Sequence, residues 1–196
     1  MLDTFSVSFE RQAPDLPALE SFFFLLEKVH HRKEEDLLFP LLLGRPSLEV
    51  GGPKCMTFFT PRVLGAGYSD GFRPLAEKLR FERQEDSLND FRKRVFSSNS
   101  MLKIPVDDHL LGALAAGRLL ACLHSASPDP QEAADLFRGL AMHLRDHIQR
   151  EEECLFQLFS RELSPAELER FRMSADALDH DLATARILAE LEKSAA

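Results

Sequence analysis

Apolar residues recur every three or four positions along four stretches of this chain, a spacing typical of amphipathic α-helices. The stretches cover about residues 16–39, 106–123, 131–160 (or from 130) and 165–193. Pro17 suits the first turn of the first helix, and Pro40 is expected to end or kink it. Ser164, Pro165 and Glu167 form a capping pattern that favours a helix start. Together these patterns predict an all-α fold.

The segments between these stretches have a weaker period. Residues 1–16 are expected to form an irregular or short-strand lead-in, and residues 54–106 an insertion of mixed loop and helix. Within the insertion, residues 72–96 are highly charged and carry only a partial apolar stripe, which favours a solvated surface helix. A chain of 196 residues is expected to form one domain, residues 1–196.

Net charge and cysteine spacing restrict the class of protein. A net charge of −8 argues against nucleic acid or an anionic membrane surface as a partner. Cys55, Cys122 and Cys154 have no CxxC spacing, and we interpret them as reduced thiols rather than a disulfide framework. No apolar run approaches the roughly 18 residues of a membrane span. We therefore expect a cytoplasmic protein without a membrane partner.

A histidine and a glutamate interrupt the apolar stripe of the first predicted helix. His30 and Glu34 are four residues apart and fall on the same helical face as Phe23, Leu26 and Leu38. An imidazole and a carboxylate are costly to bury unless they are paired or bound to a metal ion. The adjacent His31 and Glu35 repeat the four-residue spacing but are expected to face outward.

The same pair recurs 117 residues later in the third predicted helix. His147 corresponds to His30, Glu151 to Glu34, and Leu155-Phe156 to Leu38-Phe39. A single pair could be a structural hydrogen bond, but two copies on two core helices favour a metal site. Iron and manganese accept imidazole and carboxylate ligands together, and paired motifs on facing helices can hold two such ions. The absence of a thiolate pattern argues against structural zinc.

The remaining histidines supply further candidates. His109 and His180 each lie on an apolar face of their predicted helices, and both are expected to be ligands. His143 lies one turn before His147 and could be a ligand, a partner of a ligand or a packed core residue. The position of His124 near a helix end favours a capping or solvated role for its side chain.

These residues together resemble the bacterial hemerythrin-like, or HHE cation-binding, family. The resemblance rests on His30-His31-Arg32-Lys33-Glu34-Glu35 with Leu38-Phe39-Pro40, Gly51-Gly52-Pro53, Asp108-His109, and His147-Ile148 with Glu151-Glu152 and Leu155-Phe156. It implies an up-down four-helix bundle that holds two non-haem iron ions, with manganese or zinc possible, and a bridging oxo or hydroxo group. The implied ligands are His30, Glu34, His109, His147 and Glu151, with the glutamates bridging the ions.

The chain departs from the family pattern at its start. The family begins with a helix that carries another ligand histidine, but no histidine precedes His30 here. The helix around His180 could occupy that place in a circularly permuted order, which would make His180 the sixth protein ligand. A partner chain could donate the helix instead, and the apolar opposite side of the His180 helix allows a homodimer. The insertion at 54–106 is a second departure.

The function that these residues predict is binding of O2 or a related small diatomic or peroxide ligand, as a carrier, scavenger or sensor. One alternative is a diiron oxidoreductase that acts on peroxide or nitric oxide. Another is an iron-handling protein, and a third is an interaction module that contains buried His–Glu pairs and no metal. The sequence leaves open whether the protein is an enzyme.

Overall fold

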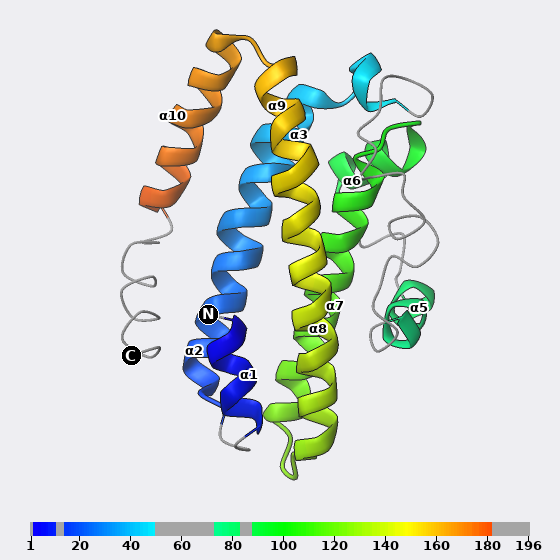
Figure 1. Ribbon diagram of the computed structural model, residues 1–196, viewed down its shortest axis with the longest axis vertical. Coiled ribbons are helices and arrows are strands. Elements are labelled where there is room, and N and C mark those ends of the chain that lie inside the picture. Colours follow the sequence, from blue (N-terminus) through cyan, green and yellow to red (C-terminus); the bar gives the residue numbers. More distant parts are fainter. Residues whose placement is uncertain (1, 11–13, 50–72, 83–87, 182–196) are drawn as a thin grey trace.

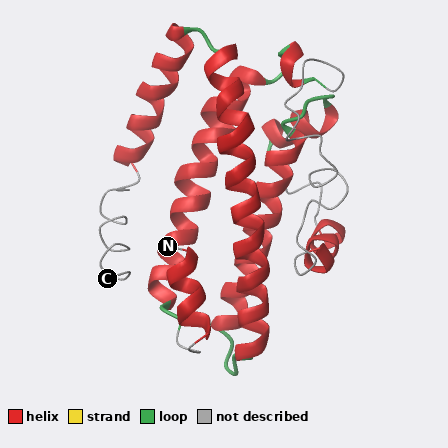
Figure 2. Ribbon diagram, viewed as in Figure 1, coloured by secondary structure: helices red, strands yellow, loops and turns green. Residues whose placement is uncertain are grey.

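The fold is all-α in the computed structural model, which describes residues 2–10, 14–49, 73–82 and 88–181. Within these ranges the chain forms helices joined by short turns, and the one extended pairing is an isolated bridge between Glu49 and Ser100 (Figure 2). Long helical rods stand side by side in Figure 1, and shorter helices flank them. The predicted fold class is therefore confirmed at the level of an all-α protein.

The first rod contains two π-helical turns. It consists of α2 (Leu16–Phe24), η1 (Leu25–His30), η2 (Lys33–Leu38) and α3 (Phe39–Leu42), and η1 and η2 are the π-helical parts. At its start, the side chain of Asp15 accepts a hydrogen bond from the backbone N–H of Ala18 at 3.1 Å.

The expectation that Pro40 ends this helix is wrong, because the helix continues to Leu42. A proline clashes with the carbonyl four residues back in a regular α-helix. Here the N–H of Phe39 bonds to the carbonyl of Glu34, five residues back, so a widened turn precedes the proline ring. We infer that this π turn accommodates Pro40.

The other two rods follow the predicted boundaries closely. The second is α7 (Lys103–Leu123); the third consists of α8 (Pro130–Arg150), the π turn η6 (Glu151–Leu155) and α9 (Phe156–Glu162). The side chain of Asp129 caps α8 by accepting hydrogen bonds from the backbone N–H groups of Gln131 and Glu132. A short turn joins α7 to α8, so these two helices pack as antiparallel neighbours.

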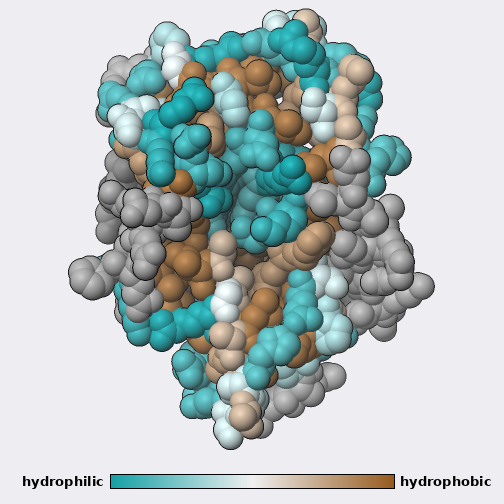
Figure 3. Space-filling model, turned by 180° about the vertical axis from the view of Figure 1, so that it is seen from behind, coloured by the Kyte–Doolittle hydropathy of each residue, from teal (hydrophilic) through white to brown (hydrophobic). Residues whose placement is uncertain are grey.

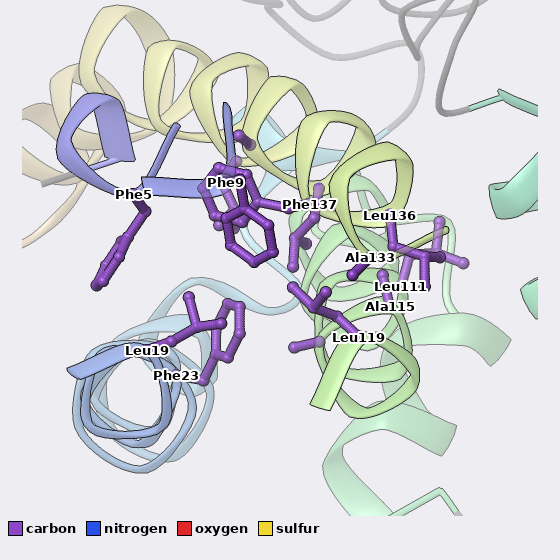
Figure 4. Close-up of a cluster of buried hydrophobic side chains, with 14 of the residues drawn as sticks. Phe5, Phe9, Leu19, Phe23, Leu111, Ala115, Leu119, Ala133, Leu136 and Phe137 are labelled. Atoms are coloured by element: carbon purple, nitrogen blue, oxygen red, sulfur yellow. The ribbon is translucent and has the colours of Figure 1, made fainter. Parts of the chain in front are cut away.

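The segment expected as an irregular or short-strand lead-in forms a helix instead, α1 (Leu2–Glu10). Phe5 and Phe9, four residues apart, lie on one face of α1 and are both buried. Phe9 stacks on Phe137 of α8 (Figure 4), and their ring centroids are 4.3 Å apart. The aromatic packing outweighs the short length of the helix.

The last described helix, α10 (Pro165–Asp181), begins as its sequence predicts. The backbone N–H of Ser164 donates to Oε2 of Glu167 at 2.8 Å, and the N–H of Glu167 donates to Oγ of Ser164 at 3.3 Å. The helix lies beside η2, and Lys33 forms an ion pair with Asp179 at 2.7 Å. The rest of the predicted 165–193 helix lies outside the described residues.

The described part of the 54–106 insertion contains α5 (Arg73–Glu82) and α6 (Asp90–Ser97), which both pack on α7. The charged segment expected as one surface helix therefore contains two. The side chains of Ala76, Leu79, Leu88 and Val95 are buried, so both helices contribute to the core. Residues 54–72 and 83–87 lie outside the described ranges.

Two apolar clusters occupy opposite ends of the bundle. One joins α1, α2, α5, α7 and α8 and includes Leu19, Phe23, Leu119 and Phe137 (Figure 4). The other joins α3, α6, α7, η6 and α9 around Phe39. Between them lies a layer of buried histidines and carboxylates. On the face opposite to that of Figure 1, hydrophilic residues gather around a hollow near the middle of the molecule (Figure 3).

Two further findings concern the class of protein. None of the described helices is both long and apolar enough to cross a membrane. The prediction of three reduced thiols is wrong for Cys154, which is disulfide-bonded with its partner outside the described residues, whereas Cys122 is free. Spacing alone does not reveal this bond, because cysteines distant in sequence can meet in the fold.

Candidate metal centre

The two His–Glu pairs of the sequence meet in one cluster between the first and third rods. One ligand atom from each of His30, Glu34, His147 and Glu151 lies within 4.8 Å of the other three. His30 and Glu34 come from the π-helical turns of the first rod, and His147 and Glu151 from the junction of α8 and η6. The structure thus brings together the residues that the repeated motif predicts.

The two glutamates form the middle of the cluster. Oε1 of Glu34 lies 3.7 Å from Nε2 of His30, and its Oε2 lies 3.1 Å from Nε2 of His109. Oε2 of Glu151 lies 3.5 Å from Nε2 of His30, and its Oε1 lies 3.1 Å from Nε2 of His147 and 3.7 Å from Nε2 of His109. Each carboxylate therefore faces different imidazoles with its two oxygens.

His109 enters the cluster from α7, as predicted. Its side chain is fully buried, and Phe39 stacks on it with ring centroids 5.8 Å apart. His30 differs from the other members, because 43% of its side chain is exposed. The cluster is therefore closed on the α7 side and open to solvent at His30.

Outer carboxylates lie beside Nδ1 of two of these imidazoles, and one of the two makes a hydrogen bond. Nδ1 of His109 donates a hydrogen bond to Oε1 of Glu35 at 2.9 Å, and Nδ1 of His147 lies 3.5 Å from Oδ2 of Asp108. A carboxylate at Nδ1 fixes the ring tautomer and leaves Nε2 free to bind a metal ion. In both residues Nε2 is the atom that faces Glu34 or Glu151.

Two arginines neutralise the outer carboxylates. The guanidinium of Arg92 in α6 donates two hydrogen bonds to Glu35, at 2.6 and 2.9 Å. Arg150 forms an ion pair with Asp108 through one guanidinium nitrogen. Burial raises the pKa of both carboxyls, but the bonds from His109 and Arg92 to Glu35, and from His147 and Arg150 to Asp108, outweigh it, so both pKa values lie below the usual range.

The buried polar atoms of the centre support occupation by a cation. Within the described part of the chain, no hydrogen-bond partner is found for Nε2 of His31, His109 and His147, both oxygens of Glu34, and Oε1 of Glu151. Buried polar groups nearly always have a hydrogen-bond partner. Here carboxylate oxygens face the Nε2 atoms of neutral imidazoles, and both kinds of atom accept hydrogen bonds. A metal ion bound by imidazole nitrogens and carboxylate oxygens would satisfy all of them, so the residues fit iron or a similar ion.

The pKa values of the inner groups also show that positive charge is favoured between the carboxylates. Burial lowers the pKa of His109 and His147, but the nearby carboxylates outweigh it and raise both pKa values above the ordinary range. Burial raises the pKa of Glu151, but the nearby imidazoles of His109, His147 and His30 outweigh it and lower that pKa. The two inner carboxylates thus favour positive charge at the neighbouring nitrogens.

Both copies of the motif contain a π turn at nearly the same register. The turn η2 spans Lys33–Leu38 and η6 spans Glu151–Leu155, which corresponds to 34–38 at the offset of 117 residues. Single π turns within α-helices occur frequently at functional sites. The repetition therefore extends from the sequence motif to the backbone.

The expectation that His31 and Glu35 face outward is wrong. His31 is 2% exposed and Glu35 is 4% exposed, and both belong to the centre. The outward direction follows from an advance of about 100° per residue in an α-helix, but a π turn holds more residues per turn. The π turns η1 and η2 therefore rotate this second His–Glu pair inward.

Sequence reasoning did not assign four other residues to the centre. Glu27, whose Oε1 lies 3.1 Å from Nδ1 of His31, precedes it by four residues, and that spacing was the available signal. Burial raises the pKa of Glu27 to about 7. Asp108 was noted only together with His109 as part of the family resemblance, and nothing local pointed to Arg92 or Arg150.

The remaining histidines are less central. Nε2 of His143 donates to the backbone carbonyl of Asp108 at 2.9 Å, and the ring lies beside Gly112. This contact favours the packed or supporting role among the predicted alternatives. His124 pairs with Glu20 at 2.7 Å on the surface, which agrees with its predicted solvated role.

His180 is not brought to the centre. It lies in α10 with an exposed side chain, and the clusters of possible ligands found among the described residues do not contain it. Its neighbour Asp179 contacts Lys33 on the outer side of η2. In this arrangement α10 lies near the first rod while its histidine faces solvent.

Comparisons with known proteins do not identify the chain. No family model matches it, and no curated protein or solved structure is significantly similar to it. Any functional assignment therefore depends on the motif, the fold and the geometry of the centre.

Proposed function

We propose that this chain is a hemerythrin-like protein, an up-down helical bundle with a non-haem diiron centre that binds O2 or a related small oxidant. The observation that carries the proposal is the buried set of unsatisfied atoms on His109, His147, Glu34 and Glu151. The three rods and a flanking helix would form the bundle, and His30, Glu34, His109, His147 and Glu151 would hold the metal.

The arrangement of carboxylate oxygens favours two ions over one. Both glutamates present one oxygen toward His30 and the other toward the His109 and His147 side. A carboxylate that faces two imidazole positions is suited to bridge two ions, as in bundles with paired carboxylate motifs. Imidazole with carboxylate is a donor set that suits iron, and thiolate is not part of it.

The protein's own residues would control access to such a centre. Bound iron would supply affinity for O2 or a small oxidant. Glu35 holds the imidazole of His109 with Nε2 toward the metal side, and Asp108 lies beside Nδ1 of His147. The apolar cluster around Phe39 excludes water from one end. A small ligand would reach the centre beside His30, whose side chain is 43% exposed.

Metal analysis of protein produced with iron tests the proposal. We expect about two iron ions per chain, together with a near-ultraviolet charge-transfer band. The His147→Ala variant should lose metal, whereas His124→Ala, the surface histidine paired with Glu20, should not. Folded wild-type protein with less than about 0.2 metal ions per chain would refute the proposal and favour the metal-free interaction module.

The exposure of His30 also favours a second candidate, an oxidoreductase that acts on peroxide or nitric oxide, because solvent-borne substrates could reach the centre. The two functions differ in their response to oxidants. A carrier should give a stable, reversible band when O2 is added to the reduced protein. An enzyme should consume many equivalents of peroxide or nitric oxide per chain.

A further inference from the structure

We propose that His31 is an additional metal ligand, held in place by Glu27, and that it takes the position expected for His180. The inference rests on the proposed metal centre and concerns which imidazole completes it. His31 lies in the centre with 2% of its surface exposed, whereas His180 is exposed on α10.

The position of the His31 ring supports this role. It stacks on His109 with ring centroids 3.8 Å apart and an interplanar angle of 11°. Its centroid lies 5.5 Å from that of His30 and 5.5 Å from that of His147, so it is adjacent to all three other imidazoles. Ligand atoms of His30, His31 and His147 also lie within 4.8 Å of one another.

The two nitrogens of His31 have different surroundings. Nδ1 lies 3.1 Å from Oε1 of Glu27, while Nε2 is buried and has no hydrogen-bond partner in the described part of the chain. This is the arrangement of His109 with Glu35: a carboxyl group at Nδ1 and an unsatisfied Nε2. A carboxyl at one ring nitrogen typically orients the other toward a metal ion. A buried ring nitrogen without a hydrogen-bond partner is uncommon in protein cores.

His31 would add a fourth imidazole to those of His30, His109 and His147, and it comes from the first rod itself. No second chain and no rearranged helix order is required.

The test compares His31→Ala with His180→Ala in the full chain loaded with iron. We expect His31→Ala to lose about half of its iron, or to release iron to a chelator roughly 10–100 times faster, with a changed absorption spectrum. Added imidazole should restore the metal content and spectrum, because it can occupy the vacated ring position. The His180→Ala protein should match the wild type.

Two results would overturn the inference: an unchanged metal content and spectrum in His31→Ala, or a loss confined to His180→Ala. If the wild type folds but binds no metal, the proposed function fails. If the wild type binds metal and His31→Ala binds it equally well, only the role of His31 fails. Should His31→Ala not fold, the cobalt-loaded wild type decides. Its NMR spectrum should show shifted, exchangeable N–H signals from about four ligand imidazoles, and three signals would refute the role of His31.

Discussion

Arg92 provides the sharpest test of how the insertion supports the centre. It belongs to α6, and its guanidinium makes two hydrogen bonds to the buried carboxylate of Glu35, which in turn accepts the Nδ1–H of His109. The Arg92→Met substitution keeps the side-chain length and removes the charge. It leaves Glu35 buried with one hydrogen-bonding partner instead of two.

The magnitude follows from the burial of the pair. Removing one member of a buried ion pair costs about 3–5 kcal/mol, because the other charge stays buried. Arg92 is 21% exposed and His109 still satisfies part of Glu35, so we expect about 2–3 kcal/mol of lost unfolding free energy in the metal-free protein. Since Glu35 orients His109, iron affinity should fall about 10–100-fold as well.

A double-mutant cycle measured by urea unfolding is the appropriate assay. The single variants Arg92→Met and Glu35→Gln and their combination should give a coupling energy of about 1–3 kcal/mol. The matched control is Arg172→Met, whose exposed pairs with Glu169 and Asp176 should leave stability unchanged. A coupling energy near zero, or equal effects in Arg92→Met and Arg172→Met, would show that α6 does not support the centre.

Three further predictions concern the scaffold. Phe9→Ala should lower the unfolding free energy by about 3 kcal/mol, because it removes the stacked partner of Phe137. The control is Phe24→Ala, since Phe24 is exposed; an equal effect of the two variants would contradict the packing of α1. Gly117→Ala should raise the unfolding free energy by about 0.5–1 kcal/mol, because Gly117 lies within α7 and the added methyl group would contact no neighbouring side chain within 4 Å. A lower unfolding free energy by urea unfolding would contradict this. The carboxyl of Glu167, which accepts bonds from Ser164 and pairs with Arg45, should have a pKa below its ordinary 4.5 by NMR. The cap therefore stabilises α10 above that pH and is lost as the pH falls through the lowered value, so a pKa of 4.5 or more would contradict the capping box.

The long helices could be predicted from sequence because local signals and tertiary packing agree there. The apolar period of α7 and α8 matches the buried face, and Asp129 and Ser164 cap the helices that follow them. The short α1 could not be predicted in the same way. Its helix depends on contacts with Phe137, more than a hundred residues away.

The inner residues of the centre were also accessible from sequence, since His30, Glu34, His147 and Glu151 repeat at one offset. The supporting residues were not, because they come from elements with no shared motif. Arg92 reaches the centre from the insertion, and Arg150 pairs with Asp108 of another rod. Contacts of this kind depend on how the helices dock, which the period of a single helix does not contain.

The π turns explain why one long helix can supply so many polar groups to one layer. In a regular α-helix, His30 and His31 point about 100° apart. Across η1 and η2 the stripe Glu27, His31, Glu35 turns inward beside the stripe His30, Glu34, and both reach the centre. The backbone hydrogen bonds of a π turn are less favourable than those of an α-helix, so the turns are expected to persist where they serve a function. Their presence in both copies of the motif is the backbone feature that a fixed helical period could not anticipate.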